Sequence, residues 1–230
     1  MSNVLLTNPN VFSLITVVAF LGAIILLAEA LNRAIFSDAE LTRKVVHIGS
    51  GNVILLAWRF EIPPWMGIGA AIVAGIVALL SYFVPILPSI NSVGRKSLGT
   101  FFYAVSIGVL IAWFFPEDPQ YAAIGILTMA WGDGLAALIG QNFGRHPYQI
   151  FGSRKSWEGS LTMATVSYLV CFLILLAVEG NLWQTWLIPL VVAIAATSFE
   201  AISKLGVDNL TVPIISGGLS FFLVQFLLHP

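Results

Sequence analysis

Long apolar segments follow one another along almost the whole chain, and they limit its possible folds more than any other feature. Most are long enough for a helix that crosses about 30 Å of hydrocarbon. A chain of 230 residues that is 58% hydrophobic and 9% charged cannot bury this surface in one soluble core. The sequence therefore predicts an all-α, polytopic integral membrane protein that forms a single domain over residues 1–230. The segments are 11–31, 45–58, 65–84, 98–115, 121–140, 160–179, 183–200 and 210–228.

The second segment departs from this pattern. About fourteen residues separate Lys44 from Arg59, and they include the polar side chains of His47 and Asn52. A helix here is tilted, half buried, or begins nearer Leu41. We therefore expect eight transmembrane helices, or seven if the second segment is not a full span.

The basic residues of the connecting loops predict the orientation. With the N-terminus outside, nine of the ten Lys and Arg residues fall on the inner side and Arg59 alone falls outside. Basic residues accumulate on the cytoplasmic side of membrane proteins, so we expect both termini outside and an active face toward the cytoplasm. The nine are Arg33, Arg43, Lys44, Arg95, Lys96, Arg145, Arg154, Lys155 and Lys204. The start, MSNVLLTNPN, has no basic residue of the kind that precedes a cleaved signal, so the first segment is expected to be retained.

Two counts restrict the function further. The formal net charge of −1 gives no indication of nucleic-acid binding, and no such partner is expected. The single cysteine, Cys171, excludes an intrachain disulfide and a cysteine metal cluster, and it is expected to pack in an apolar helix.

Polar chemistry concentrates in residues 128–160, TMAWGDGLAALIGQNFGRHPYQIFGSRKSWEGS. Asp133 lies between two glycines in an apolar helix that is expected to end at Gly140. A carboxylate inside a membrane helix is costly unless it faces a cavity, a partner or an ion, which makes Asp133 a candidate site residue. A basic loop follows, and residues 156–160 begin the next helix, whose first N–H groups favour phosphate. The alternative is that the glycines serve helix packing and the basic residues only mark the cytoplasmic side.

A second acidic group is expected on the same face. Glu200 and Lys204 have i,i+4 spacing near the end of the seventh segment, and Asp208 and Asn209 follow in a turn. A salt bridge and ordinary turn residues would explain them separately. Together with Asp133 they favour a magnesium and phosphate site, because hard cations take oxygen ligands.

Two further basic groups map to this face. Helical spacing puts Lys44, His47 and Gly51 on one side of their helix, although a histidine in a helix is also compatible with simple packing. Arg95 and Lys96 form a basic turn, for which a topological role is favoured over a phosphate contact.

Four motifs occur in a fixed order between about residues 40 and 213. They are RKVVH at 43–47, GDG at 132–134 with Gly140 and Gly144, residues 152–160 ending in KSWEGS, and Glu200 followed by DNLTVP at 208–213. This ordered set resembles the polyprenol kinase family, and within it the phytol kinases. The resemblance implies a CTP-dependent membrane kinase that transfers the γ-phosphate to a prenyl alcohol such as phytol, farnesol or geranylgeraniol. The products would be the prenyl phosphate and CDP, in phytol salvage toward tocopherol.

The resemblance also implies roles for individual residues. Asp133 and Asp208 would hold Mg²⁺, with Glu158 or Glu200 as further ligands. CTP would be held by Lys44, Arg154, Lys155, Ser156, Glu158, Gly159, Lys204 and Asn209. The candidate catalytic residues are Asp133, His47 and Lys155, and the general base is open between His47 and a carboxylate. No Walker A pattern occurs, so the nucleotide site is not a P-loop.

Three other functions stay open. A cytidylyltransferase of the kind that makes CDP-diacylglycerol would use the same CTP and magnesium but would join CMP to a lipid phosphate. A dolichol kinase is expected to have additional N-terminal spans, so the short chain is more similar to a phytol or farnesol kinase. A transporter would need charged residues along a path through the bilayer. It is disfavoured because Asp133, His47 and Glu200 all map toward the inner half of the membrane, and the outer half has no matching polar residues. The sequence does not indicate an oligomeric state.

Overall fold

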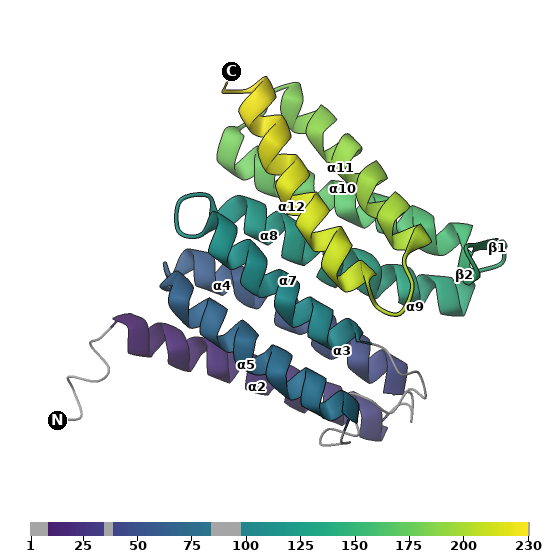
Figure 1. Ribbon diagram of the computed structural model, residues 1–230, viewed down its shortest axis with the longest axis horizontal. Coiled ribbons are helices and arrows are strands. Elements are labelled where there is room, and N and C mark those ends of the chain that lie inside the picture. Colours follow the sequence, from purple (N-terminus) through teal and green to yellow (C-terminus); the bar gives the residue numbers. More distant parts are fainter. Residues whose placement is uncertain (1–8, 35–38, 84–97, 230) are drawn as a thin grey trace.

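Helices make up almost all of the protein in the computed structural model, which describes residues 9–34, 39–83 and 98–229. Figure 1 shows them as long rods stacked side by side. The helices are α2 (Pro9–Ala34), α3 (Ala39–Gly51), α4 (Val53–Arg59), α5 (Pro64–Phe83), α7 (Gly99–Phe114), α8 (Pro119–Leu127), α9 (Gly134–Phe143), α10 (Trp157–Glu179), α11 (Gln184–Ile202) and α12 (Asp208–Leu227). A π-helical segment, η1 (Thr128–Asp133), joins α8 to α9, and two strands, β1 (Pro147–Ile150) and β2 (Ser153–Ser156), form an antiparallel hairpin. The predicted all-α class is confirmed.

Six helical segments of the described ranges are long and apolar enough to cross a membrane, which confirms a multi-pass membrane protein. They are Asn10–Leu31, Pro64–Ser81, Pro119–Phe143, Trp157–Glu179, Gln184–Ile202 and Asp208–Leu227. The fourth predicted segment forms α7, which is apolar but only 16 residues long.

The second predicted segment is two helices, of 13 and 7 residues, that meet at Asn52. The side chain of Asn52 explains this break. Its amide nitrogen donates to the carbonyl of Ile48 at 2.7 Å, while its backbone N–H donates to Gly49 at 3.1 Å. An asparagine that bonds nearby carbonyls in this way competes with the regular helical ladder. The helix also begins earlier than 45, at Ala39, as the alternative start near Leu41 anticipated.

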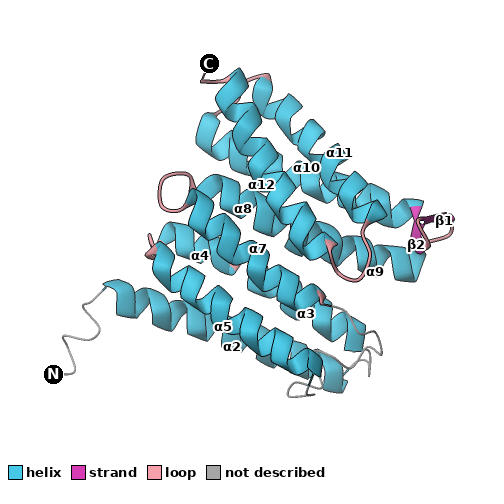
Figure 2. Ribbon diagram, viewed as in Figure 1, coloured by secondary structure: helices cyan, strands magenta, loops and turns pink. Residues whose placement is uncertain are grey.

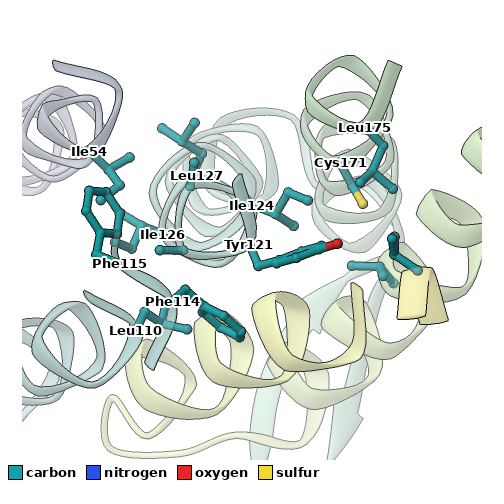
Figure 3. Close-up of a cluster of buried hydrophobic side chains, with 14 of the residues drawn as sticks. Ile54, Leu110, Phe114, Phe115, Tyr121, Ile124, Ile126, Leu127, Cys171 and Leu175 are labelled. Atoms are coloured by element: carbon teal, nitrogen blue, oxygen red, sulfur yellow. The ribbon is translucent and has the colours of Figure 1, made fainter. Parts of the chain in front are cut away.

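The interior of the bundle is built around α8. Its residues from Gln120 to Leu127 are all buried, and α4, α7, α10 and α12 pack around it. Figure 3 shows this cluster, in which the Tyr121 ring lies between side chains of α7 and α10. Cys171 is fully buried in the same cluster, so its predicted packing role is confirmed. Outer helices such as α2 instead expose most of their apolar side chains, as a lipid-facing helix does.

One end of the bundle gathers the described connections that carry basic residues, namely Arg145, Arg154, Lys155 and Lys204. In Figure 1 the end of α9, the β1–β2 hairpin and the α11–α12 connection all lie at the right. The α7–α8 connection and the end of α12 lie toward the left. Among the described residues, these connections, predicted to be inner and outer, therefore lie at opposite ends of the bundle.

The basic loop predicted after α9 has a defined structure. The helix continues past Gly140 to Phe143, which corrects the expected end, and residues 147–156 then form the hairpin seen in magenta in Figure 2. Its two-residue turn, Phe151–Gly152, has positive φ at both positions, 47° and 81°. This geometry suits the twist of a tight hairpin, and glycine adopts it without strain.

Candidate functional site

A cavity of about 1260 Å³ lies at the charged end of the bundle and brings together most of the predicted site residues. Its walls come from α3, α7, α9, α11, α12, the hairpin and the first turn of α10. Of the predicted residues, those that line it are Lys44, Asp133, Arg154, Lys155, Ser156, Gly159, Glu200, Lys204, Asp208 and Asn209. His47 and Glu158 are the two that do not.

Asp133 reaches the cavity from the last position of η1. A π-helical turn carries one extra residue and is frequent at functional sites, because it changes which side chain faces inward. The carboxylate Oδ2 accepts a hydrogen bond from Lys44 Nζ at 2.5 Å, and both side chains are buried. The predicted carboxylate therefore has a cation as its partner, supplied by α3.

Small residues bring α3 close enough for this pairing. A Cβ on Gly51 would lie 2.4 Å from the Cβ of Ala130, and one on Gly134 would lie 2.5 Å from Ile48. The indole N–H of Trp131 also donates to Asn52 Oδ1 at 3.2 Å. Gly134 therefore serves helix packing, and the packing interpretation of the glycines is correct at this position.

A second ion pair fastens the hairpin to α11. Lys155 Nζ of β2 donates to Glu200 Oε1, and Ser153 Oγ donates to the Ser203 carbonyl at 3.4 Å. Burial opposes the charge on Lys155, but the bonded Glu200 carboxylate outweighs this and raises the lysine pKa above its ordinary value. The alternative of an i,i+4 salt bridge between Glu200 and Lys204 is wrong, because α11 ends at Ile202, Lys204 lies in the following loop, and Glu200 pairs with Lys155.

Three helices begin at the cavity, and each presents the positive end of its dipole. The N-terminal residue Gly99 of α7 and the N-terminal residues Asp208 and Asn209 of α12 line it directly. For α10 the lining residues are Ser156, which caps the helix by accepting from the Gly159 N–H at 3.1 Å, and Gly159 itself. Helix N-termini attract anions through their free N–H groups and their dipoles.

Side-chain charge adds to these dipoles. Five basic and three acidic side chains line the cavity, which leaves a positive surplus. The three acidic ones, Asp133, Glu200 and Asp208, all act electrostatically on Lys155, so the charges form one interacting group. Arg154 and Lys204 have no ion-pair partner among the described residues. Such a cavity can bind a polyanion while offering carboxylate oxygens to a hard cation.

Protein ligands alone do not form a closed metal cage in the part of the chain that the structure describes. No three His, Cys, Asp or Glu side chains are close enough together there to hold an ion. The donors at the cavity nevertheless suit Mg²⁺, which usually takes one or two carboxylates and completes its shell with water and substrate phosphates.

Two predicted residues do not line the cavity, although His47 interacts electrostatically with Lys44 and Asp133, which do. His47 packs its ring on Tyr103, with 4.3 Å between ring centroids, and its buried Nε2 has no hydrogen-bond partner among the described residues. Glu158 accepts from the backbone N–H of His146 at 3.3 Å and is 2.6 Å from its ring Nδ1. This geometry gives no support to a metal role for Glu158. Arg95 and Lys96 lie outside the described residues.

Some polar residues of the cavity wall were not identified from the sequence. Thr100 and Gln141 line it without belonging to one of the four motifs, and Ser153 lies in the motif at 152–160 but was not predicted as a site residue. Thr100 is the second residue of α7. A polar side chain in the first turn of an apolar helix could have indicated that Thr100 lies at the site. Ser153 could be placed only once the hairpin was known.

Comparison with known proteins identifies the family. No family model and no solved structure matches the chain. A phytol kinase from Synechocystis sp. is 55% identical over 196 residues, which cover 85% of this chain and 84% of that protein. The chloroplastic phytol kinase 1 of Arabidopsis thaliana is 30% identical over 96% of this chain and 80% of its own length, and the chloroplastic farnesol kinase of the same plant is 29% identical over 96% and 77%. Since this similarity extends over most of each protein, the chain belongs to the polyprenol kinase family, among the phytol kinases.

Proposed function

We propose that this protein is a CTP-dependent prenol kinase that transfers the γ-phosphate of CTP to the hydroxyl of phytol or a similar prenol. The observation that carries the proposal is the cavity at one end of an apolar bundle, where positive charge, three helix N-termini and three carboxylates meet. The names of the relatives, phytol kinase and farnesol kinase, suggest the acceptor. The phytyl phosphate formed would serve phytol salvage toward tocopherol.

Phosphoryl transfer depends mainly on positioning and on neutralising the phosphate oxygens. We assign the phosphates of CTP to Arg154, Lys155 and Lys204. Arg154 and Lys204 have no competing carboxylate among the described residues, so both are available to an incoming anion. The first turn of α10, at Ser156 and Gly159, would add backbone N–H groups.

Magnesium would be held by Asp133 and Asp208, with Glu200 as a further ligand. When bound, the ion would draw charge from the phosphate oxygens. The remaining task is to remove the proton of the acceptor hydroxyl. His47 Nε2 is buried and His47 does not line the cavity, so a carboxylate that lines the cavity is the better candidate for general base.

The position of the cavity also suits a lipid acceptor. A prenol keeps its chain in the hydrocarbon and its hydroxyl near the headgroups, at the level where membrane helices end. The cavity lies at such a level, since α7, α10 and α12 begin there and α9 and α11 end there. The alcohol therefore needs no extraction from the bilayer to meet the nucleotide.

The test is an assay of the full chain in lipid with Mg²⁺. Radiolabelled CTP, ATP or UTP would be supplied with phytol, farnesol, geranylgeraniol or dolichol. We expect label from the γ-phosphate of CTP to appear in phytol. Label from the α-phosphate appearing in lipid would instead establish a cytidylyltransferase. Failure of every nucleotide with every prenol would refute the proposed function.

Orientation gives an independent prediction. We propose that the cavity faces the cytoplasm and both termini face outside, because the sequence assigns nine of the ten basic residues to the loops of the inner side. A reporter inserted at the hairpin turn, Phe151–Gly152, should read cytoplasmic. Reporters at 117–119 and after Pro230 should read external. A cytoplasmic signal after Pro230 would show that the predicted number of crossings is wrong.

A further inference from the structure

The Lys44–Asp133 pair places an ammonium group against the carboxylate that the proposed function assigns to magnesium. We infer that Lys44 is a displaceable counter-ion: it neutralises Asp133 while no metal is bound, and it turns to the phosphates of the nucleotide when the metal takes Asp133. This inference rests on the proposed function. It makes Lys44 a positioning residue whose partner depends on what occupies the cavity.

Burial explains why Asp133 needs such a partner. Its carboxylate lies within a membrane-spanning segment, and the residue is only 8% exposed. An unpaired charge in this setting is strongly destabilising. Lys44, 3% exposed, supplies the opposite charge at 2.5 Å. The pair therefore stabilises the cavity before any ligand enters it.

The pair can open without separating the helices that carry it. Other contacts hold α3 against η1 and α9, namely Gly51 on Ala130, Asn52 with Trp131, and Ile48 on Gly134. Lys44 and Asp133 both line the cavity, so a ligand there can reach them. The lysine side chain has a flexible four-carbon stem and can move its ammonium group while the backbone stays in place.

Charge determines the direction of the exchange. A divalent cation on Asp133 and an ammonium group at hydrogen-bond distance from the same oxygen repel each other. The phosphates held by Arg154, Lys155 and Lys204 would offer Lys44 an alternative partner within the same cavity. Metal and lysine should therefore compete for Asp133 in the absence of nucleotide, and nucleotide should strengthen metal binding by accepting the lysine.

The test measures metal binding rather than turnover. The full chain in lipid nanodiscs would be titrated with Mn²⁺, as a paramagnetic substitute for Mg²⁺, with no nucleotide present. We expect Lys44→Met to bind Mn²⁺ about tenfold or more tightly than the wild type, because one adjacent positive charge is removed. In the double variant, which combines Lys44→Met with Asp133→Asn, this gain in Mn²⁺ affinity should be lost. Addition of CTP should increase Mn²⁺ affinity less in Lys44→Met than in the wild type.

Lys204→Met is the matched control. It removes another cation of the cavity wall, one without a carboxylate partner among the described residues. A general electrostatic effect would raise Mn²⁺ affinity similarly in both variants, whereas displacement from Asp133 predicts a clearly larger gain in Lys44→Met. Equal gains, an unchanged affinity in Lys44→Met, or no binding by either wild type or Lys44→Met would each overturn the inference.

Thermal unfolding keeps the test decisive if Lys44→Met is poorly stable. The variant should have a lower melting temperature than the wild type without metal, and Mn²⁺ should raise that temperature more in the variant, since tighter binding stabilises the folded state more. A smaller metal-induced rise would contradict the inference. These readouts do not depend on kinase activity, so a failure to phosphorylate any prenol would remove the proposed function while leaving the metal result in place.

Discussion

Replacing Asp133 with Asn should lower the turnover of each folded molecule by about 10²–10³-fold, the range seen when one electrostatic group of a transition state is removed. Asn keeps the shape of the side chain but loses the charge that would hold magnesium beside the phosphates. Turnover would be measured with CTP and phytol, and the folded fraction would be determined in the same sample. Asp118→Asn is the matched control. Its carboxylate accepts from Gln120 at 3.1 Å and lies in the α7–α8 connection, at the opposite end of the bundle from the cavity in Figure 1, so activity should be preserved.

The stability of Asp133→Asn is expected to change in a specific direction. A lone buried carboxylate would be costly, and its neutralisation would stabilise the protein. Asp133 is paired with Lys44, however, so the substitution leaves a buried ammonium group without its partner. Breaking a buried pair from one side costs about 3–5 kcal/mol, and the melting temperature without ligand should fall. The double variant with Lys44→Met should regain much of this loss. Near-normal turnover in folded Asp133→Asn would end the metal-ligand assignment.

Most of the helical architecture could be predicted because a membrane helix is long, apolar and continuous. The segment expected at 98–115 is α7, Gly99–Phe114, and the one expected at 183–200 is α11, Gln184–Ile202. The break at Asn52 was harder to predict, since it depends on one amide that bonds Ile48 and also accepts from Trp131, 79 residues away. Local hydropathy contains no information on such a contact.

The members of the site were more predictable than their partners. Charged residues beside membrane helices are rare enough to attract attention, and ten of the twelve predicted positions line one cavity. The pairing of Lys155 with Glu200 instead depends on a hairpin that turns β2 back toward α11. The separation of Glu158 from the cavity has a similar cause, because His146 at the start of the hairpin bonds its carboxylate. The Lys155–Glu200 pair and the Glu158–His146 contact both depend on the turn at Phe151–Gly152, because this turn folds the polar residues of 145–158 into a hairpin.

The second large effect should come from Gly51, a residue with no chemical group of its own. A Cβ at this position would lie 2.4 Å from the Cβ of Ala130 and 2.9 Å from the Tyr103 hydroxyl. Ala130 belongs to the buried η1 segment and cannot move aside freely, so Gly51→Val should push α3 away from η1. Overpacking of this kind costs about 1–3 kcal/mol. Displacement of Lys44 and Asp133 by even about 1 Å should also lower turnover by roughly a hundredfold.

Gly22→Val is the control for Gly51→Val, because a Cβ at Gly22 in α2 meets no atom within 4 Å. Its melting temperature and turnover should stay close to those of the wild type. A compensating pair separates close packing from any other role of Gly51. Gly51→Ala alone should reduce both stability and activity, and adding Ala130→Gly should restore part of each, because the methyl group is then present on only one of the two facing residues. If Ala130→Gly gives no recovery, close approach at this contact is not what aligns Lys44 with Asp133, and the ion pair itself must hold α3 in place.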